Sequence, residues 1–244
     1  MENVEWQEQL GRELFGPDFE LARFPASDRG RRGLLGYTEC ITPSLVFSAY
    51  LQGIFPWYNE DEGDPVLWWS PDPRFVLPVE ELHVPQSVDR YLKHTPYTYT
   101  MDTAFPEVMK NCAAMNRPGQ NGTWIGARMV AVYTELAERG IARSVEVWHD
   151  GRLAGGLYGV LVGQVFCGES MFTIEDNSSK SAFVRFARAF IQCGGRLIDS
   201  QVYTDNMARY GAHNVSRSAF LRMENGFLPC KLTGNLKKTF EDGK

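Results

Sequence analysis

The segment Gln164–Phe172 reads QVFCGESMF and places one carboxylate, that of Glu169, among Val, Phe, Gly and Met. It follows the apolar run Leu157–Val162, and the glycine at position 163 predicts a hairpin turn between the two. Burying an unpaired carboxylate is costly. We therefore expect Glu169 either to have a polar partner or to take part in chemistry.

A second strand with polar residues follows further along the chain, within a strand expected over 196–202. Alternation puts Asp199 and Gln201 on one face of it, where the acid can accept a hydrogen bond from the amide and orient it. A helix predicted over 179–192 separates the two strands. Its buried face would carry Phe183, Phe186, Ala187 and Phe190.

An aromatic, proline-rich segment follows the first strong helix signal. Thr42 and Pro43 suit the N-cap and the first helical position, and Gly53 is a suitable C-terminal stop. Beyond it come Trp57 and the run Trp68–Arg74, WWSPDPR. Such a segment is either a packed hinge between domains or a stacking platform for a base or sugar.

The remaining pattern alternates helices with strands. Helices are predicted over 103–115 and 127–139, strands over 97–101 and 144–149, and a hairpin at 150–151. A short helix over 205–210 and a last strand over 220–232 complete the chain. This order predicts an α+β fold with a mainly antiparallel central sheet. It is compatible with the acetyltransferase layout, in which the sheet splays to admit a donor.

The composition is that of an ordinary globular chain, with 244 residues and a formal net charge of −5. This net charge does not indicate a nucleic-acid partner, although a local basic face is compatible with it. The five cysteines are widely spaced without a CxxC pair, so they predict neither a zinc site nor a disulfide framework. We found no signal peptide and no membrane-spanning apolar run. We expect a cytoplasmic, reduced protein that needs no metal.

The residues leave several kinds of chemistry open. No serine lies in a Gly-x-Ser-x-Gly elbow, and Cys167 is more typical of a core strand than of a nucleophile. Glu169 and Asp199 could be the paired acids of a glycosidase. A CoA-dependent acyltransferase would need a glycine-rich phosphate cradle, and the nearest segment, 117–122, has the wrong spacing.

A co-linear series of motifs closely resembles the leucyl/phenylalanyl-tRNA–protein transferase family, over roughly residues 33–230. The motifs are, in chain order, GIFPW at 53–57, WWSPDPR at 68–74, GTWI at 122–125, SVEVW at 144–148, GGLYGV at 155–160, FCGESMF at 166–172 and IDSQ at 198–201. The resemblance implies a transferase that moves Leu or Phe from its tRNA to the N-terminal Arg or Lys of an acceptor protein. The added residue marks the acceptor for degradation.

The resemblance also implies an architecture and a division of labour among residues. A small N-terminal domain, 1–74, would precede an acetyltransferase-like (GNAT-like) catalytic domain, 75–244, and no cofactor would be needed. Asp199 would orient Gln201. Gln201 would assist deprotonation of the attacking α-amine or stabilise the charges that develop on attack, and Glu169 would lie in the acyl-donor site.

The remaining roles that the resemblance implies concern binding. Trp57 and Trp124 would hold the 3′-terminal adenosine. Arg90 and Lys93, on a short helix expected over 87–93, would contact the tRNA backbone. The pocket for the Leu or Phe side chain would be formed by Leu157, Phe166, Met171, Phe186, Phe190 and Ile198.

Strand alternation conflicts with part of this pocket. It puts Ile198 on the face opposite Asp199, and Phe166 on the face opposite Met171, so a bulge or a strand end is required. The chain also departs from the family pattern, with Arg143 in place of a histidine. Two alternatives to the transferase remain on the residues alone: a CoA-dependent N-acyltransferase of the acetyltransferase superfamily, and a non-catalytic aromatic module that binds sugar or single-stranded RNA.

Overall fold

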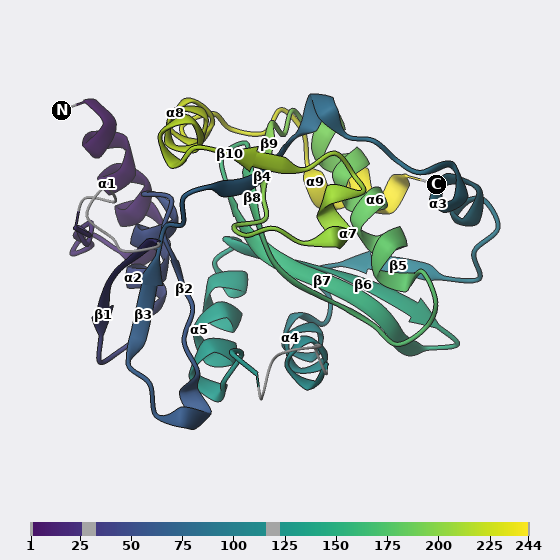
Figure 1. The fold of residues 1–244 in the computed structure, drawn as a ribbon, viewed down its shortest axis with the longest axis horizontal. Helices are drawn as coiled ribbons and strands as arrows, with labels where there is room; N and C mark the ends of the chain where they lie inside the picture. Colours follow the sequence, from purple (N-terminus) through teal and green to yellow (C-terminus); the bar gives the residue numbers. More distant parts are fainter. Residues whose placement is uncertain (1, 26–32, 116–122, 244) are drawn as a thin grey trace.

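The computed structural model describes residues 2–25, 33–115 and 123–243. A seven-stranded sheet forms the centre of the molecule, and a three-stranded sheet lies beside it near the N-terminus (Figure 1). The strands are β1 Leu34–Thr38, β2 Phe55–Pro56, β3 Val66–Trp69, β4 Arg74–Pro78, β5 Thr98–Met101, β6 Ala142–His149, β7 Arg152–Val162, β8 Val165–Thr173, β9 Leu197–Asp199 and β10 His213–Val215.

Helices cover both faces of the large sheet. The helices of the described ranges are α1 Glu2–Phe15, α2 Pro43–Tyr50, α3 Gln86–Leu92, α4 Phe105–Ala114, α5 Ala127–Glu138, α6 Ser178–Gln192, α7 Asp205–Ala208, α8 Arg217–Phe227 and α9 Leu236–Asp242, with short 3-10 turns at Glu60–Glu62 and Val79–Glu81. Helices α4 and α5 lie on one side of the sheet, and α6 and α9 on the other (Figure 1). None of the helices in the described ranges is long and apolar enough to cross a membrane.

The large sheet has the strand order β10-β4-β9-β8-β7-β6-β5. Its neighbouring strands run antiparallel, except for the parallel pair β8 and β9. The expected α+β class with a mainly antiparallel central sheet is therefore confirmed. The small sheet, ordered β1-β3-β2, is antiparallel throughout. The division of the chain into domains at residue 74 stays a prediction.

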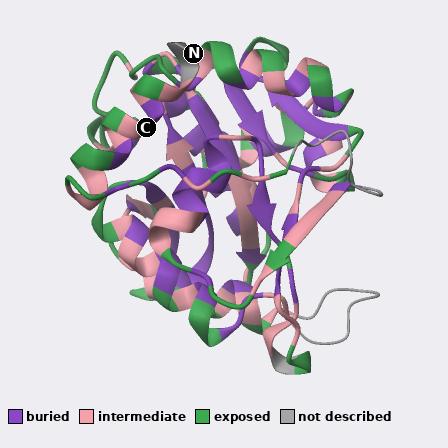
Figure 2. Cartoon of the chain, turned by 90° about the vertical axis from the view of Figure 1, so that its left-hand side faces the viewer, coloured by how far each residue is buried: buried purple, intermediate pink, exposed green. Residues whose placement is uncertain are grey.

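Two hydrophobic cores lie on opposite faces of the large sheet. Strand β7 shows the alternation: Tyr158 and Val160 belong to the core beneath α2, α4 and α5, whereas Leu157 belongs to the core beneath α6. Figure 2 shows the strands as the buried centre, with exposed residues on the outer sides of the helices. The N-terminal region shares the first of these cores, through residues such as Phe47 and Trp68.

The parallel pair is short, and its two strands then diverge. Residues 165–167 of β8 pair with residues 197–199 of β9, and the pairing stops there. Strand β8 continues to Thr173, whereas β9 ends at Asp199 because Gln201 adopts a left-handed φ of 58°. The strand expected over 196–202 is therefore wrong beyond Asp199. The divergence provides the splay that an acetyltransferase-like layout requires.

A bulge lies in β8 at Glu169. Tyr158 of β7 is opposite Ser170, and the next residue, Gly159, is opposite Gly168, so Glu169 is the extra residue. Because a bulge reverses alternation, residues before and after Glu169 can face the same side of the sheet. The bulge that the sequence required is present.

The local signals for turns and caps were largely right. Thr42 caps α2, accepting a hydrogen bond from the Leu45 N–H at 3.2 Å, and Pro43 is the first helical residue. The predicted hairpin at Asp150 and Gly151 joins β6 to β7, and both residues have positive φ, of 48° and 75°.

The C-terminal region was predicted wrongly. The last strand expected over 220–232 is instead helix α8 and the turn after it. Its buried residues Phe220, Glu224 and Leu228 are four apart, which is a helical spacing. Ser216, whose hydroxyl accepts from the Ala219 N–H at 3.3 Å, was an available N-cap signal. Strand β10 and helix α9 were not anticipated.

Candidate active site

A pocket of about 360 Å³ opens where β8 and the chain after β9 diverge. Its apolar wall consists of Leu157, Phe166, Met171, Phe183, Ile198 and Met207. Its polar groups are Glu169, at the bulge in β8, and Ser200 and Gln201, which follow β9. Two tryptophans, Trp57 and Trp124, complete the lining from the N-terminal sheet and from the residues before α5. The pocket therefore joins an apolar chamber to a carboxyl and an amide group.

The pocket brings together most of the residues singled out from the sequence. Those on its wall are Trp57, Trp124, Leu157, Phe166, Glu169, Met171, Ile198 and Gln201. The bulge at Glu169 explains how Phe166 and Met171 can both reach it from one strand. Asp199 is not on the wall but lies behind it, fully buried.

Two predicted wall residues, Phe186 and Phe190, do not line the pocket. Phe186 packs behind Phe166, with ring centroids 4.2 Å apart, and Phe190 stacks on Phe186 at 5.7 Å. The α6 residue on the wall is Phe183, because Phe186 and Phe190 lie one and two turns further along the helix, inside the core. The two residues support the wall instead of forming it. The helical pattern identified the buried face of α6 but not the turn that borders the pocket.

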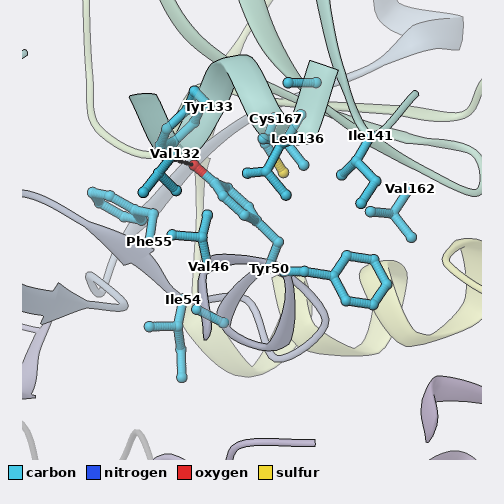
Figure 3. Close-up of a cluster of buried hydrophobic side chains, with 14 of the residues drawn as sticks. Val46, Tyr50, Ile54, Phe55, Val132, Tyr133, Leu136, Ile141, Val162 and Cys167 are labelled. Carbon is cyan, nitrogen blue, oxygen red and sulfur yellow. Dashed lines mark hydrogen bonds between the residues drawn. The ribbon is translucent and has the colours of Figure 1, made fainter. Parts of the chain in front are cut away.

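Glu169 has a tyrosine partner. The Tyr50 hydroxyl donates to Glu169 Oε1 at 2.6 Å, and the hydroxyls of Tyr50 and Tyr133 are 2.8 Å apart. These tyrosines come from α2 and α5, and Figure 3 shows them meeting in the core beside Cys167. No sequence pattern indicated a role at the site for either tyrosine, because helical periodicity alone marks both as ordinary core residues.

Burial raises the pKa of Glu169 to about 8, against the opposing effect of the hydrogen bond from Tyr50. The negative charge of Asp199 adds to the rise, and the guanidinium of Arg74 opposes it. Near neutral pH the Glu169 carboxyl is therefore largely protonated. It nevertheless reaches the pocket, since its residue is only partly buried.

The Gln201 side chain has two possible amide orientations. In one, its nitrogen is 3.3 Å from Glu169 Oε1 and 3.4 Å from the Asp199 carbonyl oxygen, but its oxygen then faces two other carbonyls. In the other, the nitrogen donates to the carbonyls of Ser200 and Gly168, both at 3.0 Å. We assign the second orientation, because its hydrogen bonds are shorter and its amide oxygen no longer faces the carbonyls of Ser200 and Gly168. The amide oxygen of Gln201 then faces Glu169, whose protonated carboxyl can donate to it.

Asp199 forms a buried ion pair with Arg74, at the first position of β4. Arg74 Nε donates to Asp199 Oδ1 at 2.8 Å and Arg74 Nη2 to Oδ2 at 2.6 Å, with side chains 1% and 0% exposed. The backbone N–H of Gln201 also donates to Oδ1, at 3.0 Å. The Asp199 carboxylate therefore contacts the backbone of Gln201, not its side-chain amide. The expectation that both side chains share one strand face was wrong because the strand ends before Gln201.

Arg74 also connects this turn to the other side of the pocket. Its Nη1 donates to the Gly53 carbonyl at 3.1 Å, three residues before the pocket residue Pro56. Its guanidinium lies over the rings of Phe55, at 5.0 Å, and Phe220, at 4.4 Å. The sequence contained Arg74 at the end of WWSPDPR but did not pair it with Asp199. A buried acid requires a cation, yet nothing local indicates which one.

A second buried acid, Glu224 of α8, lies next to this ion pair. Its side chain is 1% exposed, and neither carboxylate oxygen has a hydrogen bond within the part of the chain that the structure describes. Burial raises its pKa well above the usual value, and Arg74 opposes the rise. A Cβ added to Gly53, whose φ is +69°, would lie 2.8 Å from Glu224 Oε2. Helix α8 is therefore packed closely against the segment that leads to the pocket.

The two cations predicted to meet tRNA lie outside the pocket wall. Arg90 and Lys93 are at the C-terminal end of α3, and both residues are exposed. Lys93 is 3.9 Å from Asp89, which also forms a 2.6 Å ion pair with Arg188 of α6. The short helix is present as expected, but its charges are shared with an acid. The segment 117–122, which had been weighed as a CoA cradle, lies outside the described residues.

An α+β sheet that splays around an apolar pocket, with a carboxyl and an amide at the opening, is the kind of site expected of an acyl-group transferase. Residues 76–225 match the family model described as leucyl/phenylalanyl-tRNA protein transferase, and residues 39–72 match that of its N-terminal domain. The chain belongs to the leucyl/phenylalanyl-tRNA protein transferase family.

Curated relatives agree with this assignment. A leucyl/phenylalanyl-tRNA–protein transferase of Nitratidesulfovibrio vulgaris (strain DP4) is 48% identical over 81% of this chain and 84% of that protein. The enzymes of the same name from Myxococcus xanthus (47%, covering 81% and 84%) and Flavobacterium johnsoniae (42%, covering 87% and 96%) are similar. The two family-model matches together include the pocket-lining residues and the turn after β9.

Among solved structures, the chain overlaps loosely with a GCN5-related N-acetyltransferase from Kribbella flavida. That overlap has a TM-score of 0.34 and 11% identity, and it covers 71% of this chain and 61% of the other. A GCN5-related N-acetyltransferase-like protein from Streptococcus suis also has a TM-score of 0.34, with 13% identity over 87% and 96% of the two chains. Overlaps this loose carry no argument about the reaction.

Proposed function

We propose that this protein transfers Leu or Phe from aminoacyl-tRNA to the N-terminal Arg or Lys of an acceptor protein, and so marks the acceptor for degradation in the cytoplasm. The observation that carries the proposal is the pocket of about 360 Å³ at the sheet splay, with apolar walls and a carboxyl and an amide at its opening. Membership of the family supports this activity over that of a CoA-dependent N-acyltransferase.

The apolar chamber suits the side chain of the transferred residue. Leu157, Phe166, Met171, Phe183 and Ile198 would enclose it, with Phe186 and Phe190 as support from behind. Such a chamber excludes charged side chains because it offers them no partner. It discriminates weakly between apolar side chains of similar size, which accounts for the use of both Leu and Phe.

The tryptophans at the opening suit the adenosine that carries the ester. The Trp57 side chain is 38% exposed, and its position is fixed by Trp69, whose indole Nε1 donates to the Trp57 carbonyl at 2.8 Å. Trp124 borders the same pocket from another segment of the chain. Aromatic rings stack on bases with useful affinity. The exposed Arg90 and Lys93 would contact the phosphate backbone further from the ester.

The reaction needs positioning more than activation, because an aminoacyl ester is already reactive. The acceptor α-amine attacks the ester carbonyl, a C–N bond forms, the C–O bond to the tRNA breaks, and a proton passes from nitrogen to the leaving 3′-oxygen. The Gln201 amide, held by two backbone carbonyls, would present its oxygen to the attacking amine. Asp199 would hold the turn on which Gln201 lies.

Glu169 is the only carboxyl group among the pocket-lining residues that the structure describes. Its raised pKa, about 8, lets it exchange a proton near neutral pH. In the protonated form it would donate to the Gln201 amide oxygen, and in the ionised form it would attract an ammonium group into the pocket. Both forms suit an acid in the acyl-donor site.

The test is transfer of radiolabelled Leu from Leu-tRNA to a peptide that begins with Arg, beside an otherwise identical peptide that begins with Ala. We expect label on the Arg peptide only. Absence of label from both peptides, with folded protein and intact Leu-tRNA, would reject the proposed function. The next measurement in that case is CoA binding.

A further inference from the structure

The rim of the pocket between β9 and α7 presents two side chains to solvent. Val202, Thr204 and Asn206 line the pocket, so Tyr203 and Asp205 lie between lining residues. Tyr203 is 58% exposed, and Asp205 is exposed as well. An aromatic ring left largely in water beside an apolar pocket suggests a surface that a ligand covers.

Contacts on its inner side hold the Tyr203 ring in place. The ring meets Phe75 of β4 edge to face, with centroids 5.1 Å apart. Its hydroxyl donates to Asp205 Oδ1 at 2.8 Å. These contacts fix the ring and the carboxylate relative to each other. The ring is still 58% exposed, and the Asp205 carboxylate lies at its hydroxyl.

The Asp205 carboxylate has no cationic partner among the ion pairs formed by residues 2–25, 33–115 and 123–243. An acid at the start of α7 also favours that short helix, a structural role that would hold for any pocket. That role leaves the exposed ring unexplained. A carboxylate and an aromatic ring side by side form a site that suits a guanidinium or ammonium group.

We propose that Asp205 and Tyr203 bind the cationic side chain of the acceptor's N-terminal Arg or Lys. This inference rests on the function proposed above. The α-amine and the side chain of an N-terminal residue share one Cα, so a side-chain site must lie close to the group that receives the amine. Tyr203 and Asp205 follow Gln201 by two and four residues, on the rim of the same pocket.

The test compares two acceptor peptides that differ only at residue 1, which is Arg in one and citrulline in the other. Citrulline keeps the shape of Arg and lacks its charge. With saturating donor, we expect the wild type to favour the Arg peptide in kcat/KM. Asp205→Asn should lower kcat/KM for the Arg peptide about fivefold to tenfold, mainly through KM, because it removes one exposed charge contact. The citrulline peptide should be affected less than twofold.

Two further variants separate this role from a structural one. Glu107→Gln is the matched control, since Glu107 is an exposed acid in the first turn of another helix, α4. Glu107→Gln should leave kcat/KM unchanged for both peptides. Tyr203→Leu should weaken use of the Arg peptide, whereas Tyr203→Phe, which keeps the ring, should retain more of it.

Each other outcome has a definite meaning. If the wild type prefers Arg and Asp205→Asn prefers it equally, the inference is overturned while the proposed function stands. Equal kcat/KM for the Arg and citrulline peptides in the wild type would reject the inference that this site recognises the positive charge. No transfer to either peptide overturns the proposed function, and this inference with it.

Discussion

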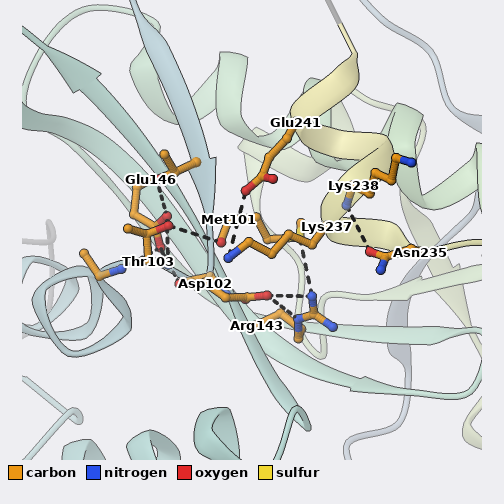
Figure 4. A network of polar contacts seen from close by, with 12 residues as sticks. Met101, Asp102, Thr103, Arg143, Glu146, Asn235, Lys237, Lys238 and Glu241 are labelled. Carbon is orange, nitrogen blue, oxygen red and sulfur yellow. Dashed lines mark hydrogen bonds and ion pairs between the residues drawn. The ribbon is translucent and has the colours of Figure 1, made fainter.

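Two glutamates on the same sheet, Glu146 and Glu169, have very different surroundings. Glu146 on β6 is fully buried and accepts from the hydroxyls of Ser144 and Thr100 and from the N–H groups of Thr103 and Ala104 (Figure 4). Both oxygens have partners, and the network joins β5, β6 and the start of α4.

Glu169 on β8 lies in a bulge at the edge of a pocket. Its donor is the Tyr50 hydroxyl, and burial raises its pKa to about 8. The difference shows how the same residue type can brace a sheet in one place and remain available for proton exchange in another. The number of donors aimed at the carboxylate decides which role it has.

The largest loss of stability is expected from a change at Asp199, beside the pocket. Asp199→Ala should lower the free energy of unfolding by about 3–5 kcal/mol, because it leaves the Arg74 guanidinium buried without its partner. Urea denaturation measures the loss. The control is the double variant Arg74→Met with Asp199→Leu, which should recover most of the stability but not the transfer activity. An Asp199→Ala protein as stable as the wild type would contradict the ion pair.

In the Glu146 network, Glu146→Ala should lower the free energy of unfolding by about 2–4 kcal/mol. The change leaves two hydroxyls and two N–H groups without an acceptor. Thermal or urea unfolding gives the value. Glu107→Ala, on the helix that begins at this network, is the exposed control and should change stability little. A loss as small as that of the control would mean that the network contributes little.

Unlike the two previous variants, Glu169→Gln should change stability in a way that depends on pH. At pH 5, where Glu169 is protonated in the folded state, the variant should match the wild type within about 1 kcal/mol. A folded-state pKa raised from 4.5 to about 8 favours folding below pH 4.5, and this advantage is lost as the pH rises through 8. The wild type should therefore lose stability relative to the Gln variant between those pH values. Parallel curves for the two proteins would refute the raised pKa.

The smallest stability effect is expected far from both glutamates, on α3. Arg90→Gln and Lys93→Gln should each change stability by less than about 0.5 kcal/mol, because both residues are exposed. If each contacts one phosphate, each change should also reduce the slope of log affinity for tRNA against log salt by about 1. Filter binding at several salt concentrations gives this slope, and an unchanged slope would remove the residue from the tRNA contact.

Local patterns in the sequence predicted local structure well. Helix α6 followed from its apolar period, the β6–β7 hairpin from Asp150 and Gly151, and the start of α2 from Thr42. These features depend on residues close together in the chain, so short windows contain the information. Helix α8 is an exception, because its apolar residues are compatible with a strand and Ser216 is the local signal for a helix start.

Features that depend on distant residues could not be predicted in the same way. Arg74 and Asp199 are 125 positions apart, and no local pattern links them. The same is true of Tyr50 and Glu169. Alternation required a bulge or a strand end near the pocket, yet only the pairing of β7 with β8 locates it at Glu169. The family motifs identified which residues gather at the pocket, without their contacts.

The contact between Gly53 and α8 joins two segments that are synthesised at different times. The segment that leads to Trp57 is translated well before the residues packed against Gly53, such as Phe220 and Glu224. The partner of Arg74 also comes late. The surroundings of the pocket are thus complete only after α8 has been synthesised. A nascent chain too short to include α8 therefore lacks the helix that packs against this side of the pocket.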